Sequence, residues 1–454
     1  MNMENQDKLD FRKVVPIFVI VLIDLLGLTV IIPLLPLYAA GFNATPVVIG
    51  VVGASYPVMQ FIGAPVLGRL SDRYGRKPVL VISQIGTFTG FIILGYASSL
   101  WMLVFSRVID GISGANIATA QAVITDSTTE KNRTQGLGLI GAAFGIGFIL
   151  GPAIAFGALT VTGNNYSAPA FLAAGFSLMS ILLTVFWLPE TLPKEERNRT
   201  QGKPIFSINA LWEALNHPAV GFLLVLLFAQ QVAFGGFERM LALFTLTQMG
   251  MNASRNAGIF VYVGFIVVVV QVYFLGRWSK RFGDRRLVYL GLAALSIGML
   301  AFAFTPRVPM PGYSRAELED ELSTGGIQGA ESTSRGEFGI DLPEDGGSGW
   351  NGIAWVLASM IPLSVGGGVL QPALNSLVTK RVEHQEVGGM LGISTSLLSA
   401  ANVIAPLLGG VIFQEISPRA PFLLGGVIMA MLLVLAIKLI RPAENQLSAS
   451  NVEM

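Results

Sequence analysis

The chain has 454 residues, of which 52% are hydrophobic and only 13% are charged, and its net charge is +1. A soluble domain carries about 25% charged residues, so the composition excludes a fully water-facing surface and indicates a membrane protein. A nearly neutral chain has no electrostatic basis for binding nucleic acid. The absence of cysteine excludes disulfides and thiol chemistry.

Apolar stretches long enough to cross a bilayer, about 20 residues each, recur along the whole chain. The first one is too long for the apolar core of a signal peptide, so we interpret it as a membrane helix. Pro and Gly within these stretches are common in membrane helices, because neighbouring helices satisfy the freed backbone groups. The twelve predicted spans are 14–38, 47–67, 78–97, 101–125, 135–157, 168–188, 218–246, 256–276, 287–305, 352–378, 388–412 and 420–440.

The distribution of Lys and Arg predicts the orientation of these spans. With the N-terminus placed inside, 22 of the 29 basic residues fall on inside segments and five on outside loops. Cytoplasmic loops carry such an excess, so we expect both termini in the cytoplasm of a cell-membrane protein. The predicted organisation is a six-helix bundle over 1–188, a polar cytoplasmic linker over 189–217, a second bundle over 218–441 and a cytoplasmic tail over 442–454.

An internal repeat supports this division. The stretch Gly68–Lys77 (GRLSDRYGRK) has a weaker copy, Gly276–Arg285 (GRWSKRFGDR), 208 positions later, with five of ten positions identical. Further on, Gly151-Pro152 matches Ala405-Pro406 at an offset of 254, and the difference of 46 is about the length of an acidic, Gly- and Ser-rich outside loop over 306–351. We therefore expect an all-α membrane protein with two six-helix bundles related by pseudo-two-fold symmetry, a site near the midplane between them, and a largely disordered insertion.

Three carboxylates fall inside the predicted spans, namely Asp24, Asp110 and Glu238. A charge at the bilayer centre costs on the order of 3 kcal/mol, so such residues point to function. Asp24 is ten residues into its helix, which places it about 15 Å deep, near the midplane of a core about 30 Å thick. A carboxylate that moves between two environments can bind a proton on one side and release it on the other.

Arg107 lies in the same span as Asp110, three residues away. It stays charged, so it needs an acidic partner, carbonyl groups or water. Asp24 could pair with it as a purely structural contact, and Asp110 could merely neutralise it. The predicted proton-coupling set is Asp24, Asp110, Glu238 and Arg107. Uncharged polar residues in the spans either line a substrate cavity or bond helices together; these are Gln121, Gln230, Gln231, Gln371, Asn375 and Asn402.

The first basic stretch and a glycine-rich span carry the remaining motifs. Two glycines of the stretch are expected to allow a tight turn, its acid to cap a neighbouring helix, and its arginines to meet an acid at the inner end of span four. This gating set is Gly68, Asp72, Arg73, Gly75, Arg76 and Asp126. In span five, the pairs Gly141/Gly145 and Gly147/Gly151 remove side chains so that helices approach closely, and Pro152 follows the second pair.

At these residues the chain resembles the major facilitator superfamily, and within it the twelve-span drug:proton antiporters, most of all the tetracycline-efflux group. The resemblance implies that Asp24 couples transport to protons, that the gating set is a cytoplasmic latch, and that Gly147, Gly151 and Pro152 form an antiporter motif. The tetracycline exporters carry further acidic residues in the third and ninth helices. Here spans 78–97 and 287–305 contain neither Asp nor Glu, a departure that bears on the substrate.

We therefore predict a monomeric, proton-coupled antiporter that exports small amphipathic compounds by rocking its two halves. It is expected to be no enzyme and to need no cofactor or metal, because no Walker motif or metal-ligand cluster is visible and the proton gradient supplies the energy. The alternatives are a nutrient symporter and a lipid or lipid-linked flippase of the same fold. A non-transporting membrane receptor is a further alternative, although it would not need midplane carboxylates.

Overall fold

The computed structural model describes residues 11–128, 133–193, 197, 208–325, 340–382 and 387–440. These residues form helices joined by short connections and contain no strand. Eleven of the helices are long and apolar enough to cross a membrane. The predicted all-α membrane fold is confirmed.

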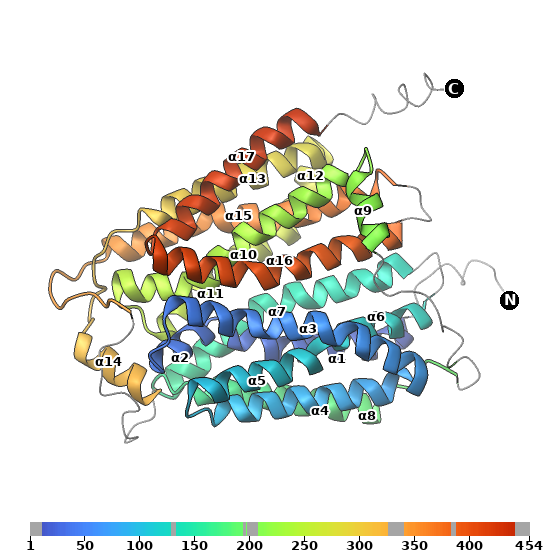
Figure 1. The fold of residues 1–454 in the computed structure, drawn as a ribbon, viewed down its shortest axis with the longest axis horizontal. Coiled ribbons are helices and arrows are strands. Elements are labelled where there is room, and N and C mark those ends of the chain that lie inside the picture. The colour runs from blue at the N-terminus through green and yellow to red at the C-terminus, as the bar shows by residue number, and fades with distance from the viewer. Residues whose placement is uncertain are drawn as a thin grey trace.

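Two groups of helices lie one above the other (Figure 1). The first half contains α1 (Phe11–Ile31), α2 (Leu35–Gly41), α3 (Pro46–Tyr74), α4 (Arg76–Gly95), α5 (Leu100–Ser113), η2 (Gly114–Asn116), α6 (Ile117–Asp126), α7 (Arg133–Val161) and α8 (Ser167–Phe186). The second half contains α9 (Ile208–Asn216), α10 (Gly221–Met249), α11 (Ala253–Val268), η4 (Val269–Leu275), α12 (Gly276–Phe282), α13 (Asp284–Ala303), α14 (Arg315–Thr324), α15 (Asn351–Thr379), α16 (Val387–Glu415) and α17 (Ala420–Leu439).

The fourth predicted span, 101–125, is a broken helix. Helices α5 and α6 are joined by the single 3-10 turn η2, so neither is long enough to span alone. Side chains from neighbouring helices satisfy carbonyls at the break: Ser83 Oγ donates to Ser113 O at 2.6 Å, and Gln60 Nε2 donates to Gly114 O at 3.2 Å. Such support is what allows an interrupted helix at membrane depth.

The repeat in the sequence is also a repeat of backbone conformation. Gly75 separates α3 from α4 with φ +106°, and Gly283 separates α12 from α13 with φ +77°. Residues other than glycine rarely adopt these backbone angles. The second half also has an aromatic core, in which Phe244 of α10 and Phe422 of α17 have ring centroids 4.5 Å apart.

The two sides of the molecule differ. The start of α1, the end of α17 and the α3–α4 joint lie on one side, here called the terminal side, and α14 lies on the opposite, insertion side (Figure 1). The halves touch toward the insertion side, where Val47 N donates to Gln414 Oε1 at 3.2 Å. A side chain on Gly50 there would come within 2.4 Å of the Pro406 carbonyl oxygen. At the terminal-side glycines Gly68 and Gly141 a side chain would meet no described residue within 4 Å. The described arrangement is therefore closed on the insertion side.

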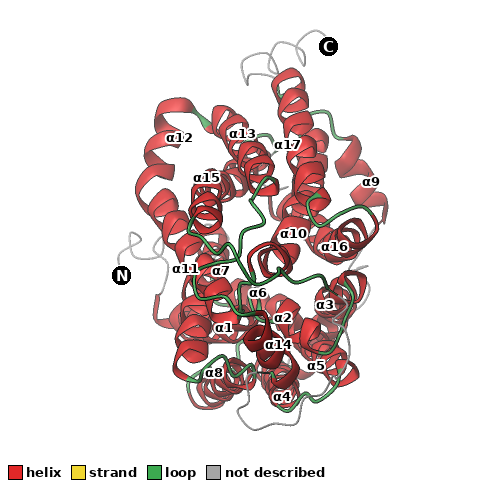
Figure 2. Cartoon of the chain, turned by 90° about the vertical axis from the view of Figure 1, so that its left-hand side faces the viewer, coloured by secondary structure: helices red, strands yellow, loops and turns green. Residues whose placement is uncertain are grey.

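The insertion corrects the expectation of a largely disordered loop. Within 306–351, residues 306–325 and 340–351 are described, and they include the helix α14. This helix has a capped start, with Ser314 Oγ accepting from Glu317 N, and it buries Leu318 and Leu322. Figure 2 shows α14 in front of the ends of the first-half helices, next to α2. The prediction of disorder from composition therefore missed that α14 has two leucines on one face that can be buried.

Candidate functional site

Asp24 of α1 lines a small, mostly apolar cavity inside the first half, which Asp110 also lines. The cavity has a volume of about 20 Å³, and Gln84, Tyr56 and Asn116 also line it. That volume holds about one water molecule. Asp24 Oδ2 accepts a hydrogen bond from Asn116 Nδ2 at 2.8 Å, while its shielded Oδ1 has no hydrogen-bond partner among the described residues. The carboxylate is thus held through one oxygen, while the other oxygen is buried and unpaired in the described part of the chain.

The broken helix positions the partner of Asp24. Asn116 is the last residue of η2, so the change of helix geometry between α5 and α6 sets the position from which its amide meets α1. A 3-10 turn in mid-helix often marks a functional hinge. The backbone irregularity and the candidate proton site therefore occur at the same place.

Arg107 pairs with Asp110 and not with Asp24. Arg107 Nη1 lies 3.0 Å from Asp110 Oδ2, and both side chains are only 2% exposed. The guanidinium also lies over the Phe91 ring, 5.4 Å from its centroid. The structural alternative in which Asp24 neutralises Arg107 is therefore wrong for this conformation. Asp110 has a buried counter-ion, whereas Asp24 has no cationic partner among the described residues, and the proton-coupling roles of both stay predictions.

The antiporter-motif glycines bring α7 directly onto α1. Thr29 Oγ1 donates to the Gly147 carbonyl at 2.9 Å, and a side chain on Gly151 would meet Thr29 Oγ1 at 2.1 Å. A side chain on Gly147 would lie 3.3 Å from Leu25, the residue after Asp24. These glycines therefore fix the helix that carries the carboxylate. The other predicted pair does not pack this way, since Gly141 faces open space.

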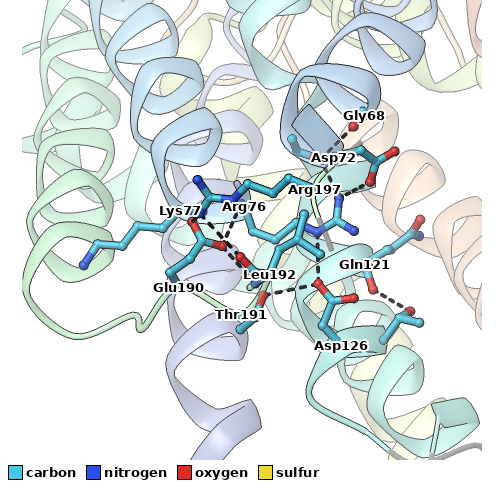
Figure 3. A network of polar contacts seen from close by, with 12 residues as sticks. Gly68, Asp72, Arg76, Lys77, Gln121, Asp126, Glu190, Thr191, Leu192 and Arg197 are labelled. Carbon is cyan, nitrogen blue, oxygen red and sulfur yellow. Dashed lines mark hydrogen bonds and ion pairs between the residues drawn. The ribbon is translucent and has the colours of Figure 1, made fainter. Parts of the chain in front are cut away.

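The latch on the terminal side is centred on Arg76, the first residue of α4 (Figure 3). Its Nε donates to Asp126 Oδ2 at 2.9 Å, its Nη1 donates to Ser71 Oγ at 2.8 Å, and the same nitrogen pairs with Asp72. The side chain joins α3, α4 and α6 and is largely buried. The predicted contact of Arg76 with Asp126 is present.

Three details of the latch differ from the prediction. Gly68 lies inside α3 and makes no turn, so the turn depends on Gly75 alone. Arg73 lies over the Tyr74 ring instead of meeting Asp126. The cap of α4 is Glu190, whose carboxylate accepts from Arg76 N at 2.9 Å, a favourable place for negative charge. Pro189-Glu190, at the end of the sixth span, was the available sequence signal.

The second half carries the same contact with its charges exchanged. Arg76 and Asp284 correspond at the repeat offset of 208, and Asp126 and Lys380 at the offset of 254. Lys380 Nζ lies 2.5 Å from Asp284 Oδ2, and Ser279, the counterpart of Ser71, donates to Asp284 Oδ1 at 2.6 Å. Each half therefore fastens its terminal-side helix ends with a buried central charge, positive in the first half and negative in the second.

The other predicted cavity residues are scattered. Gln231 of α10 donates to Asn402 of α16 at 2.9 Å, and its neighbour Gln230 is buried and donates to Leu227 O. The remaining three are Gln371, which is exposed, Asn375, which is half-buried, and Gln121, which lies beside the latch and outside the Asp24 cavity (Figure 3).

Glu238 is half-buried in α10 and forms no ion pair within the described part of the chain. It does not line the Asp24 cavity. The structure therefore brings Asp24, Asp110 and Arg107 into one neighbourhood and leaves Glu238 outside it. The reasoning from sequence missed Asn116 and Tyr56, although a polar Asn six residues after Asp110 was a visible signal.

Comparison with known proteins decides the family. The sequence profile of the Major Facilitator Superfamily matches residues 17–314 and 346–453. The chain belongs to the major facilitator superfamily. It is thus a transporter of that superfamily and an integral, multi-pass membrane protein. The match leaves out 315–345, so the insertion is an addition to the shared fold, as the two repeat offsets indicated.

Curated relatives are drug-resistance proteins. The class B tetracycline resistance protein of Escherichia coli is 30% identical over 403 residues, which are 88% of each chain. Multidrug resistance protein 2 of Bacillus subtilis (strain 168) is 26% identical over 420 residues, 91% of this chain and 92% of that one. The predicted resemblance to the tetracycline-efflux group is confirmed.

Solved structures share the fold. The human organic anion transporter MFSD10 (TETRAN) superposes with a TM-score of 0.62, is 21% identical, and covers 94% of this chain and 99% of its own. A POT family transporter in complex with 5-aminolevulinic acid superposes with a TM-score of 0.69 at 13% identity, covering 96% of this chain and 99% of its own. At these identities the likeness concerns architecture alone.

Proposed function

We propose that the protein is a proton-coupled antiporter that exports small amphipathic compounds from the cytoplasm by alternating access. The observation that carries the proposal is Asp24, a carboxylate on a small cavity with one oxygen bonded to Asn116 and the other without a partner among the described residues. Unlike Asp110, it pairs with no cation among the described residues. The tetracycline- and multidrug-resistance relatives support export of a drug-like compound.

In this proposal the terminal side is cytoplasmic and the described state faces inward. Substrate enters between the halves from the terminal side, while the contacts of α3 with α16 close the other side. Apolar helix surfaces would hold an amphipathic compound, and the Gln231–Asn402 pair offers neutral hydrogen-bond groups on the second-half wall. Loss of the Asp24 proton to the cytoplasm and its uptake from outside would drive the cycle.

The proton gradient is then the energy source, and no cofactor is required. The latches at Arg76 and Asp284 each hold helices of one half together, so each half can move as one body. The closely packed Gly147 and Gly151 transmit that motion to α1. The proposed working unit is a monomer.

The experiment that tests this function is compound-induced proton movement in proteoliposomes. Purified protein is reconstituted with a pH-sensitive dye inside, and a panel of cationic, zwitterionic and anionic amphipathic drugs is added. We expect proton movement with at least one compound, its loss in Asp24→Asn, and its retention in Glu344→Gln, which removes an exposed acid from the insertion. Transport without any proton movement would contradict the coupling.

A further inference from the structure

One carboxylate of the insertion joins the two halves of the molecule. Glu321 of α14 accepts from Tyr166 OH at 3.1 Å through Oε1, and from Asn164 Nδ2 at 3.0 Å and Asn252 Nδ2 at 3.2 Å through Oε2. Asn164 and Tyr166 lie between α7 and α8 of the first half, whereas Asn252 caps α11 of the second half. A single side chain thus binds both halves on the insertion side.

The donors around Glu321 are held in place by the backbone. Asn164 Oδ1 accepts from Ser254 N at 3.2 Å, and Asn252 Oδ1 accepts from Arg255 N at 3.2 Å. Each amide therefore has its oxygen engaged and its NH₂ group directed at the carboxylate. The Asn164–Ser254 bond is itself a second contact between the halves.

Apolar packing and a backbone hydrogen bond add to this junction. Leu322 is 1% exposed, and a side chain on Gly41 of α2 would come 2.4 Å from the Leu322 carbonyl oxygen. Just after α14, Gly325 O accepts from Tyr166 N at 2.9 Å. The helix belongs to the second half by sequence, yet it packs on the first half. Any motion that parts the halves on this side must break these contacts.

We propose that α14, through Glu321, is a latch on the insertion side that holds the inward-facing state closed and must release before the transporter opens outward. Glu321 is a positioning residue in this scheme and touches no substrate. The inference rests on the alternating access of the proposed function. Because the family profile omits 315–345, the latch is a property of this chain added to a shared fold.

The absence of cysteine makes a distance measurement direct. Spin labels at Ser98→Cys and Arg419→Cys, two exposed positions on insertion-side loops of opposite halves, report the separation of the halves by pulsed electron paramagnetic resonance. The test variant Asn164→Asp keeps the acceptor for Ser254 N but places a carboxylate against Glu321. We expect the ratio of long to short distances to rise roughly fivefold or more, the range of ordinary conformational coupling.

The matched control is Asn165→Asp, which adds the same charge one residue away and keeps the acceptor that Ser167 N uses. Adding Glu321→Gln to Asn164→Asp should restore the short distance, because the amide can donate to the new carboxylate. Tyr166→Phe, which removes only the hydroxyl, should also raise the long-distance population.

Equal distance distributions in Asn164→Asp and Asn165→Asp would overturn the latch, as would failure of both Glu321→Gln rescue and the Tyr166→Phe effect. The measurement uses neither substrate nor a proton gradient. It can therefore fail while antiport is observed, or succeed while antiport is absent, so the latch and the proposed function are tested separately.

Discussion

Asp110→Asn and Asp24→Asn should have opposite consequences for stability, although both remove one carboxylate from the first half. The Asp110 carboxylate lies 3.0 Å from Arg107, and both side chains are 2% exposed. Removing it leaves the guanidinium buried with no counter-ion, a change that typically costs about 3–5 kcal/mol. The remaining Phe91 ring recovers about 1–2 kcal/mol of attraction at most, and the wild type already has that contact.

Within the described part of the chain, Asp24 has no such cationic partner. In Asp24→Asn the bond from Asn116 persists as a neutral one, with a loss of about 1 kcal/mol, and the removal of a poorly solvated charge offsets that loss. We expect thermal unfolding of purified Asp24→Asn to match the wild type within about 1 kcal/mol, and Asp110→Asn to unfold several degrees lower. Adding Arg107→Met to Asp110→Asn should recover most of the loss, because the unpaired charge is gone.

Two results would contradict this difference: Asp110→Asn being as stable as the wild type, or Asp24→Asn being destabilised to the same extent as Asp110→Asn. The first result would mean that Arg107 is solvated. The second would mean that Asp24 is a structural ion partner in the protein as purified.

Three further predictions concern other parts of the account. Gly151→Leu should displace α1, because a side chain at position 151 would meet Thr29 Oγ1 at 2.1 Å. Cysteine cross-linking between α1 and α7 should fall, and transport should be lost. Unchanged transport would refute the close packing of α7 on α1. Gly75→Ala forces alanine into a φ of +106°, a strained backbone conformation that costs about 1–3 kcal/mol. Turnover should drop while the substrate Kd stays within about twofold. A large loss of substrate affinity would contradict a latch remote from the substrate. Burial raises the pKa of Glu321. Among the described residues Tyr166 is the titratable group that bonds to Glu321, and burial and Glu321 raise the pKa of Tyr166 further above neutrality. Because the closed state then binds the Glu321 proton more tightly than an open one, the closed fraction should be higher in acid and fall as pH rises through the raised pKa; the same pH dependence in Glu321→Gln would refute this.

Features coded by local chemistry could be predicted from the sequence. Arg76 and Asp126 were expected to meet because a basic stretch and an acid fall at inner ends of neighbouring spans, and they do. The repeat at Gly75 and Gly283 can be detected in the sequence because both positions need a residue that adopts a positive φ. Membrane spans can be predicted from the sequence because a helix that crosses the lipid core needs about 20 mostly apolar residues.

Contacts between side chains of different helices inside the bundle could not be predicted from the sequence. The sequence left open whether Arg107 pairs with Asp24 or with Asp110, and only the three-dimensional arrangement assigns Arg107 to Asp110 and gives Asp24 the partner Asn116. The disorder expected for the insertion came from average composition. That average concealed a short helix with Ser314 and Glu317 at its start and Leu318 and Leu322 one turn apart on its buried face.

The central claim is that Asp24 carries the proton that is exchanged for substrate, and proton release on substrate binding tests it most directly. Purified protein in weakly buffered detergent solution is mixed with a transported compound while the pH is recorded. We expect wild type to release protons on binding, with a dependence on pH, and Asp24→Asn to bind the compound and release none. Undiminished proton release by Asp24→Asn would show that another group carries the proton and would contradict the account.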